Sequence, residues 1–134
     1  MSHWTTVKTQ IKDVQALIAA ATELGLAVEL PSSTGQRPVI RGYATMRQEV
    51  DLAIKLKGRY DVGFLKQADG TYQMTADWWQ GHVAAEIGAE GGRLCQLYAF
   101  HVIAIQARKK GLSLFRSVTD DGSLRVVLQG RTLP

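Results

Sequence analysis

The chain has 134 residues, a net charge of +4 at pH 7, one cysteine, and an ordinary balance of 46% hydrophobic and 21% charged residues. This length suits a single domain over residues 1–134 that folds without a disulfide, and one cysteine excludes an intrachain disulfide, which favours a reducing compartment. No segment is long and apolar enough to span a membrane, and the first residues lack a secretory-signal pattern, so we expect a cytoplasmic protein.

The first half of the chain alternates between strand-like and helix-like patterns. The expected elements, in chain order, are a strand at 3–8, a helix at 9–24, a strand at 26–30, a loop at 31–38, and strands at 39–43 and 50–57. Thr9 is the expected N-cap of the helix, and Gly25 is its expected stop. Pro31 and Pro38 bound the clearest loop.

The centre of the chain predicts a β-hairpin. Turn residues separate one alternating run at residues 60–66 from another at 71–79. The second run ends in Asp77-Trp78-Trp79. Because successive strand residues point to opposite faces, Trp78 is the expected core residue, and Trp79, on the face of Asp77, is the expected contact residue.

The second half begins with the Ala- and Gly-rich segment 80–92, which we expect to be a loop. A helix over residues 93–110 is expected to end at Gly111, followed by a hairpin and a loose tail at 130–134. The order strand, helix, glycine, strand, strand occurs in both halves. This echo is compatible with a duplicated βαββ unit or with two ordinary helix-to-strand turns.

Together these elements predict an α+β fold. An antiparallel sheet would carry two amphipathic helices on one face, because each helix must bury its apolar stripe. The other sheet face would be solvated or covered by a partner.

Chemical motifs are sparse. The sequence contains no phosphate-binding glycine loop, no His-Glu-x-x-His and no Gly-x-Ser-x-Gly, so we expect no cofactor. Its three histidines are widely separated, and we expect no metal site. Cys95 lies in the apolar stripe of a predicted helix, as a small buried hydrophobic residue would.

Two further residues complete the candidate binding set. Arg41 is a suitable partner for a carboxylate or an aromatic face. His101, near Tyr98 on a helical stripe, is either a core residue or a site residue facing Asp77. The predicted binding residues are Arg41, Asp77, Trp78, Trp79, Tyr98 and His101.

Motifs along nearly the whole chain point to a known family. They are the opening Met1–Asp13, Arg41-Gly42-Tyr43, Tyr60-Asp61-Val62-Gly63-Phe64, Ala76-Asp77-Trp78-Trp79, Tyr98-Ala99-Phe100-His101 and Lys110-Gly111. In this order they resemble the hypothetical chloroplast reading frame 35 family, a domain of unknown function in plastids, cyanobacteria and other bacteria. The resemblance implies a small α+β protein without an established reaction, and a role beside an AAA-type ATPase.

Three hypotheses stay open. The first is a non-enzymatic adaptor or regulatory protein that contacts a protein partner, such as an AAA-type ATPase, through the predicted binding residues. The second is a nucleic-acid-binding module that uses the open sheet face. The third is a small-molecule-binding protein or enzyme that uses Asp77 and His101. No feature of the sequence sets the oligomeric state.

Overall fold

The computed structural model describes residues 3–130 of the chain. In this part of the chain the strands are β1 (Trp4–Lys8), β2 (Ala27–Glu29), β3 (Val39–Arg41), β4 (Arg47–Glu49), β5 (Leu52–Lys55), β6 (Asp61–Lys66), β7 (Tyr72–Asp77), β8 (Ser113–Val118) and β9 (Leu124–Gln129). The helices there are α1 (Val14–Glu23), α2 (His82–Ile87) and α3 (Gly92–Lys109), with 3-10 turns η1 (Trp79–Gly81) and η2 (Ala89–Gly91).

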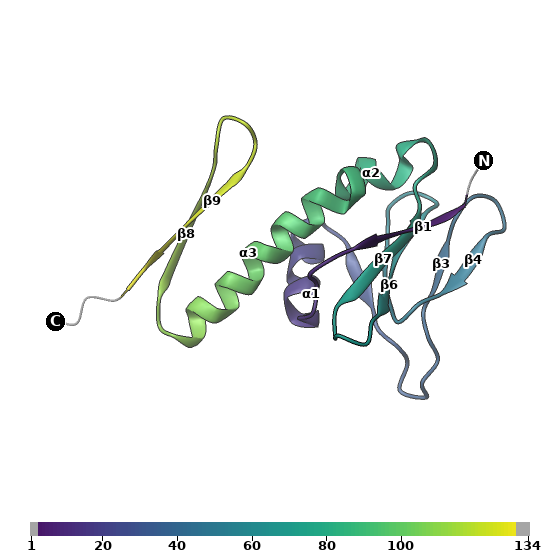
Figure 1. Ribbon diagram of the computed structural model, residues 1–134, viewed down its shortest axis with the longest axis horizontal. Helices are drawn as coiled ribbons and strands as arrows, with labels where there is room; N and C mark the ends of the chain where they lie inside the picture. The colour runs from purple at the N-terminus through teal and green to yellow at the C-terminus, as the bar shows by residue number, and fades with distance from the viewer. Residues whose placement is uncertain (1–2, 131–134) are drawn as a thin grey trace.

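The main sheet is antiparallel, and its five strands lie in the order β1-β7-β6-β5-β2. Helices α1 and α3 pack together on one face of this sheet (Figure 1). The register sets Val62 opposite Ala76 and Phe64 opposite Met74, and all four side chains are buried against the helices. The predicted α+β class, with an antiparallel sheet and helices on one face, is therefore confirmed.

The cap of α1 differs from the sequence prediction. Asp13, rather than Thr9, is the N-cap, because its Oδ1 accepts hydrogen bonds from the backbone N–H groups of Gln15 and Ala16. Thr9 instead donates its hydroxyl to the carbonyl of Tyr72 on β7. The helix consequently begins at Val14, and the preceding residues cross from the sheet to the helix layer.

The second face of the sheet is covered by the chain itself. Hairpin β3–β4 lies across it, and Ile40 and Val50 are buried against Ala53 of β5. Gly63 of β6 makes this close approach possible, because a Cβ there would lie 2.5 Å from Val50 Cγ1 and 3.1 Å from Ile40 Cδ1. The expectation that solvent or a partner covers the middle of this face is therefore wrong.

Residues 80–92, predicted as a loop, are mostly helical. They hold α2 between the turns η1 and η2, and α2 buries Val83 and Ile87, which are four residues apart on one helix face. Two glycines of this segment precede helices: Gly81 and Gly91 take the left-handed conformation at the N-caps of α2 and α3. Residues 31–38 form a loop as predicted, and of the predicted tail only Gly130 lies within the described residues.

Hairpin β8–β9 is a separate two-stranded sheet on the far side of α3 from the main sheet (Figure 1). The two halves of the chain therefore differ. Strand β2 returns to the main sheet and pairs with β5, whereas β8 pairs with β9. Among residues 3–130 no helix combines the length and apolar character needed to cross a membrane.

Candidate functional site

Two buried carboxylates lie side by side at one end of the main sheet. Asp61 is the first residue of β6 and Asp77 the last residue of β7. Since Val62 pairs with Ala76, the two aspartates occupy facing positions on the sheet face opposite the helices. Both are fully buried, so each needs hydrogen-bond donors from the surrounding chain.

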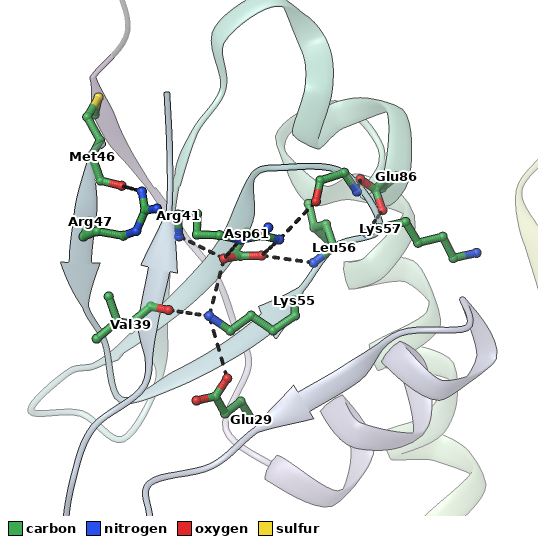
Figure 2. Close-up of polar contacts among 11 residues, drawn as sticks. Glu29, Val39, Arg41, Met46, Arg47, Lys55, Leu56, Lys57, Asp61 and Glu86 are labelled. Carbon is green, nitrogen blue, oxygen red and sulfur yellow. Dashed lines mark hydrogen bonds and ion pairs between the residues drawn. The ribbon is translucent and has the colours of Figure 1, made fainter. Parts of the chain in front are cut away.

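Asp61 receives its donors mainly from Arg41. The guanidinium of Arg41 donates from Nε to Oδ2 and from Nη2 to Oδ1, each at 2.8 Å, and its backbone N–H donates to Oδ2 at 2.9 Å (Figure 2). The backbone of Leu56 and the ammonium of Lys55 complete the set. Burial alone raises the pKa of Asp61, but the hydrogen bonds from Arg41 and the charges of Lys55 and Arg41 outweigh it and lower the pKa below the usual range.

Asp77 fixes two aromatic segments. Its Oδ2 accepts the backbone N–H of Tyr43 at 2.9 Å, and its Oδ1 accepts that of Trp79 at 3.1 Å. Between the two anchored residues Arg41 and Tyr43, a Cβ on Gly42 would lie 2.9 Å from the Trp4 ring and 3.2 Å from Asp77. Asp61 and Asp77 therefore hold the tripeptide Arg41-Gly42-Tyr43 against the sheet end.

An open cleft of about 780 Å³ lies over this end of the sheet. Its lining residues are Arg41, Gly42, Tyr43, Ala44, Arg47, Gly58, Arg59, Tyr60, Trp79, His82 and Glu86. Four of them form a connected series of rings: Tyr43 meets Trp79 edge to face at 4.9 Å, Trp79 lies 6.3 Å from His82, and His82 lies 5.0 Å from Tyr60. The cleft thus combines arginines with an aromatic wall.

The structure brings together part of the predicted binding set. Arg41 and Trp79 line the cleft, and Asp77 accepts the backbone N–H groups of Trp79 and Tyr43. Trp78 does not line it, because the strand ends at Asp77; its ring packs against the core, and Nε1 donates to the carbonyl of Thr5. The prediction that the strand continues to Trp79 is wrong, since Trp79 begins the turn η1.

Tyr98 and His101 belong to other contacts. The Tyr98 hydroxyl accepts the backbone N–H groups of Lys12 and Asp13, each at 2.9 Å, and so holds the entry to α1. His101 contacts Glu23 of α1 at 3.1 Å. Neither residue lines the cleft, so an acid–base pair of Asp77 and His101 has no geometric support.

Several residues in or beneath the cleft are absent from the predicted binding set. Arg47, Arg59 and His82 come from a strand start, a turn and a helix start that share no periodicity. Asp61 was also not predicted, although an aspartate inside a β-rich run is unusual and could have signalled a buried partner for Arg41.

Within residues 3–130 no group of histidine, cysteine and acidic side chains could hold a metal ion. Cys95 is half-buried, and burial raises the pKa of its thiol.

Comparison with known proteins places the chain in a family. The family described as "Protein of unknown function (DUF1257)" matches residues 20–127. The chain is 30% identical to an uncharacterized ycf35 protein of Pyropia yezoensis and 32% identical to one of Cyanophora paradoxa, each over 96% of this chain and 97% of the relative. The chain belongs to the ycf35 family. No solved structure matches it. The predicted family resemblance is therefore confirmed.

Proposed function

We propose that the chain is a cytoplasmic, non-enzymatic adaptor that holds a protein partner on the outer face of hairpin β8–β9. The observation that carries the proposal is an apolar surface on a sheet of only two strands. Phe115 and Val127 pair across the hairpin, and 55% and 45% of their surfaces are exposed. Such pairs are normally buried, and an exposed cluster of them marks an interaction surface.

The hairpin has an inner and an outer face. On the inner face Arg116 binds both carboxylate oxygens of Glu23, at 2.9 and 3.1 Å, and its guanidinium lies 4.3 Å from the centre of the Phe100 ring. Alternation along the register puts Phe115, Val127 and Arg125 on the outer face. The body of the protein therefore contacts only part of the inner face, where Val118 and Leu128 are 70% and 49% exposed, and makes no such contact with the outer face.

The surroundings of the outer face indicate the chemistry of the partner. Arg125 lies on this face and has no ion pair within the described residues. Two further basic residues, Arg108 and Lys109, end α3 shortly before β8 begins at Ser113. A two-stranded sheet also leaves unpaired backbone groups along its edges. These features suit an extended segment with apolar and acidic side chains that adds to the hairpin as a third strand. The family resemblance makes an AAA-type ATPase the first candidate partner.

The test compares two variants of matched character. Phe115→Ser combined with Val127→Ser removes the outer apolar pair, whereas Leu30→Ser removes an apolar side chain that is 48% exposed elsewhere, in the chain after β2. We expect the hairpin variant to lose a partner that wild type and the Leu30 variant both capture from native cells, and we expect cross-links from that partner to fall on residues 113–129. Equal capture by the hairpin variant would overturn the proposal. So would a dimer of the chain that this variant dissolves, because the occupant would then be a second copy.

A further inference from the structure

The aromatic cleft over the sheet end is a second site, separate from the hairpin. Strands β3 and β4 lie on the opposite side of the main sheet from α3, whereas β8 and β9 lie beyond α3 (Figure 1). We propose that the cleft binds a small anionic ligand with a planar ring, of the mononucleotide class.

The charges of the cleft favour an anion. Arg41 is neutralised by Asp61 beneath it, but its Nη1 group has no hydrogen-bond partner within the described residues. Arg47 donates only from Nη1, to the carbonyls of Ala44 and Met46. Arg59 has neither a hydrogen bond nor an ion pair in residues 3–130. Guanidinium groups with unused N–H donors are the usual partners of phosphate oxygens.

The single acidic side chain of the lining does not cancel this charge. Both carboxylate oxygens of Glu86 accept backbone N–H groups, from Lys57 at 2.7 Å and from Gly58 at 3.1 Å. With Asp61 offsetting Arg41, the positive charges of Arg47 and Arg59 exceed the negative charge of Glu86. The cleft therefore carries a net positive charge.

The rings favour a ligand with a flat, apolar surface. Tyr43 is 48% exposed although it is aromatic, and its ring stands edge-on to Trp79. Aromatic side chains of this kind stack on nucleobases irrespective of the base, and they do so best beside arginines that bind the backbone or phosphate. A volume of about 780 Å³ lies in the range of small-molecule sites and exceeds the needs of an inorganic anion.

Backbone strain is concentrated beside the same rings. In the described chain the non-glycine residues with positive φ are Ala44, Gln80 and Glu90, at 53°, 54° and 53°. Ala44 directly follows Tyr43, and Gln80 directly follows Trp79. Strained residues persist where the surrounding structure fixes them, and they gather at ligand sites. The two carboxylate-anchored segments thus hold Tyr43 and Trp79 in place at a cost in backbone energy.

The proposal is tested by calorimetry with three probes on the full chain: adenosine monophosphate, adenosine and inorganic phosphate. We expect the monophosphate to bind, and each fragment to bind about tenfold or more weakly, since a phosphate contact and a stacked ring each contribute that much. Arg47→Gln combined with Arg59→Gln should lower the affinity for the monophosphate about tenfold without changing the melting temperature. Arg93→Gln, an exposed arginine outside the cleft, should leave it unchanged.

Three results with these probes would overturn the proposal. They are no heat of binding with millimolar monophosphate, equal binding by the double arginine variant, and equal binding of inorganic phosphate alone. Tighter binding of free phosphotyrosine than of any nucleotide would also overturn it, because the ring and phosphate would then come from a modified peptide. Tyr43→Ala provides an independent check, since this exposed ring can be removed without opening the core. The variant should lower the affinity for adenosine monophosphate more than the affinity for inorganic phosphate.

Discussion

Replacing Asp61 by asparagine tests whether this carboxylate organises the sheet end. The side chain keeps its shape but loses its charge. Each carboxylate oxygen accepts at least two hydrogen bonds: Oδ2 accepts the backbone N–H and Nε of Arg41 at 2.9 and 2.8 Å, and Oδ1 accepts Nη2 of Arg41 at 2.8 Å and the backbone N–H of Leu56 at 3.3 Å. In either orientation the new amide nitrogen therefore faces at least two donors. Removing one partner of a fully buried ion pair costs about 3–5 kcal/mol.

The Arg41 side chain is 37% exposed and can turn partly toward water, which reduces this cost. We expect Asp61→Asn to lower the free energy of unfolding by about 2–3 kcal/mol at pH 7, measured by urea denaturation with tryptophan fluorescence. Asp120→Asn is the matched control. Asp120 lies in the exposed turn of the β8–β9 hairpin, and its replacement should change stability by less than about 0.5 kcal/mol.

The pH dependence gives the same prediction a second measurement. The pKa of Asp61 is lowered in the folded state relative to about 3.9 in the unfolded chain. A lowered carboxyl pKa stabilises the fold fully above the unfolded value, and this contribution is lost as the pH falls through the folded value. The stability difference between wild type and Asp61→Asn should therefore be constant from about pH 7 to 5 and shrink below about pH 4. A difference below about 0.5 kcal/mol at pH 7, or one that does not shrink in acid, would refute the reasoning.

Three more predictions follow from single contacts. Gly63→Ala should lower the free energy of unfolding in urea by about 1–3 kcal/mol, because a Cβ there meets Ile40 and Val50. The control, Gly92→Ala, lies in a helix beside open space and should leave stability unchanged or raise it, so equal effects of the two variants would contradict this. Tyr98→Phe should cost about 1–2 kcal/mol, since two backbone N–H groups before α1 lose their acceptor, and an unchanged unfolding midpoint would be contrary evidence. Arg116→Met should speed proteolysis within residues 112–130 while leaving the melting of the main sheet intact; unchanged cleavage would show that Glu23 does not hold the hairpin.

Much of the fold could be predicted because its strands bury alternate residues. Val62, Phe64, Met74 and Ala76 all face the helices, and this period of two is visible in the sequence. The predicted strand ends were wrong where residues adopt backbone conformations that their types do not signal. The strand ends at Asp77 because Trp78 already leaves the extended conformation, with φ −84° and ψ 11°, and Gln80 then adopts a positive φ that its residue type does not signal.

The site was less predictable because its members meet through long-range polar contacts. Arg41 and Trp79 were identified by residue type, as an arginine and an aromatic residue suited to binding. Arg59 was not, because it lies in a turn that meets Arg41 only through long-range contacts, from Arg41 to Asp61 and to the carbonyl of Gly58. Tyr98 and His101 share a helical stripe with core residues, and no pattern in the sequence indicates that their polar atoms bind elements other than the cleft.

The two buried aspartates make better sense as positioning groups than as sources of stability. Buried ion pairs can often be replaced by apolar residues without loss of stability, because burying the charges costs as much as their attraction returns. Next to Asp61 and Asp77 the sheet also carries an apolar cluster of Ile40, Val50 and Ala53, which packs hairpin β3–β4 on the sheet. The carboxylates add a fixed orientation instead: Asp61 aligns the guanidinium of Arg41, and Asp77 sets the backbone of both rings that form the mouth of the cleft. A rigid mouth lowers the ordering cost that a small ligand would otherwise meet, so the arrangement favours binding over mere closure of the sheet.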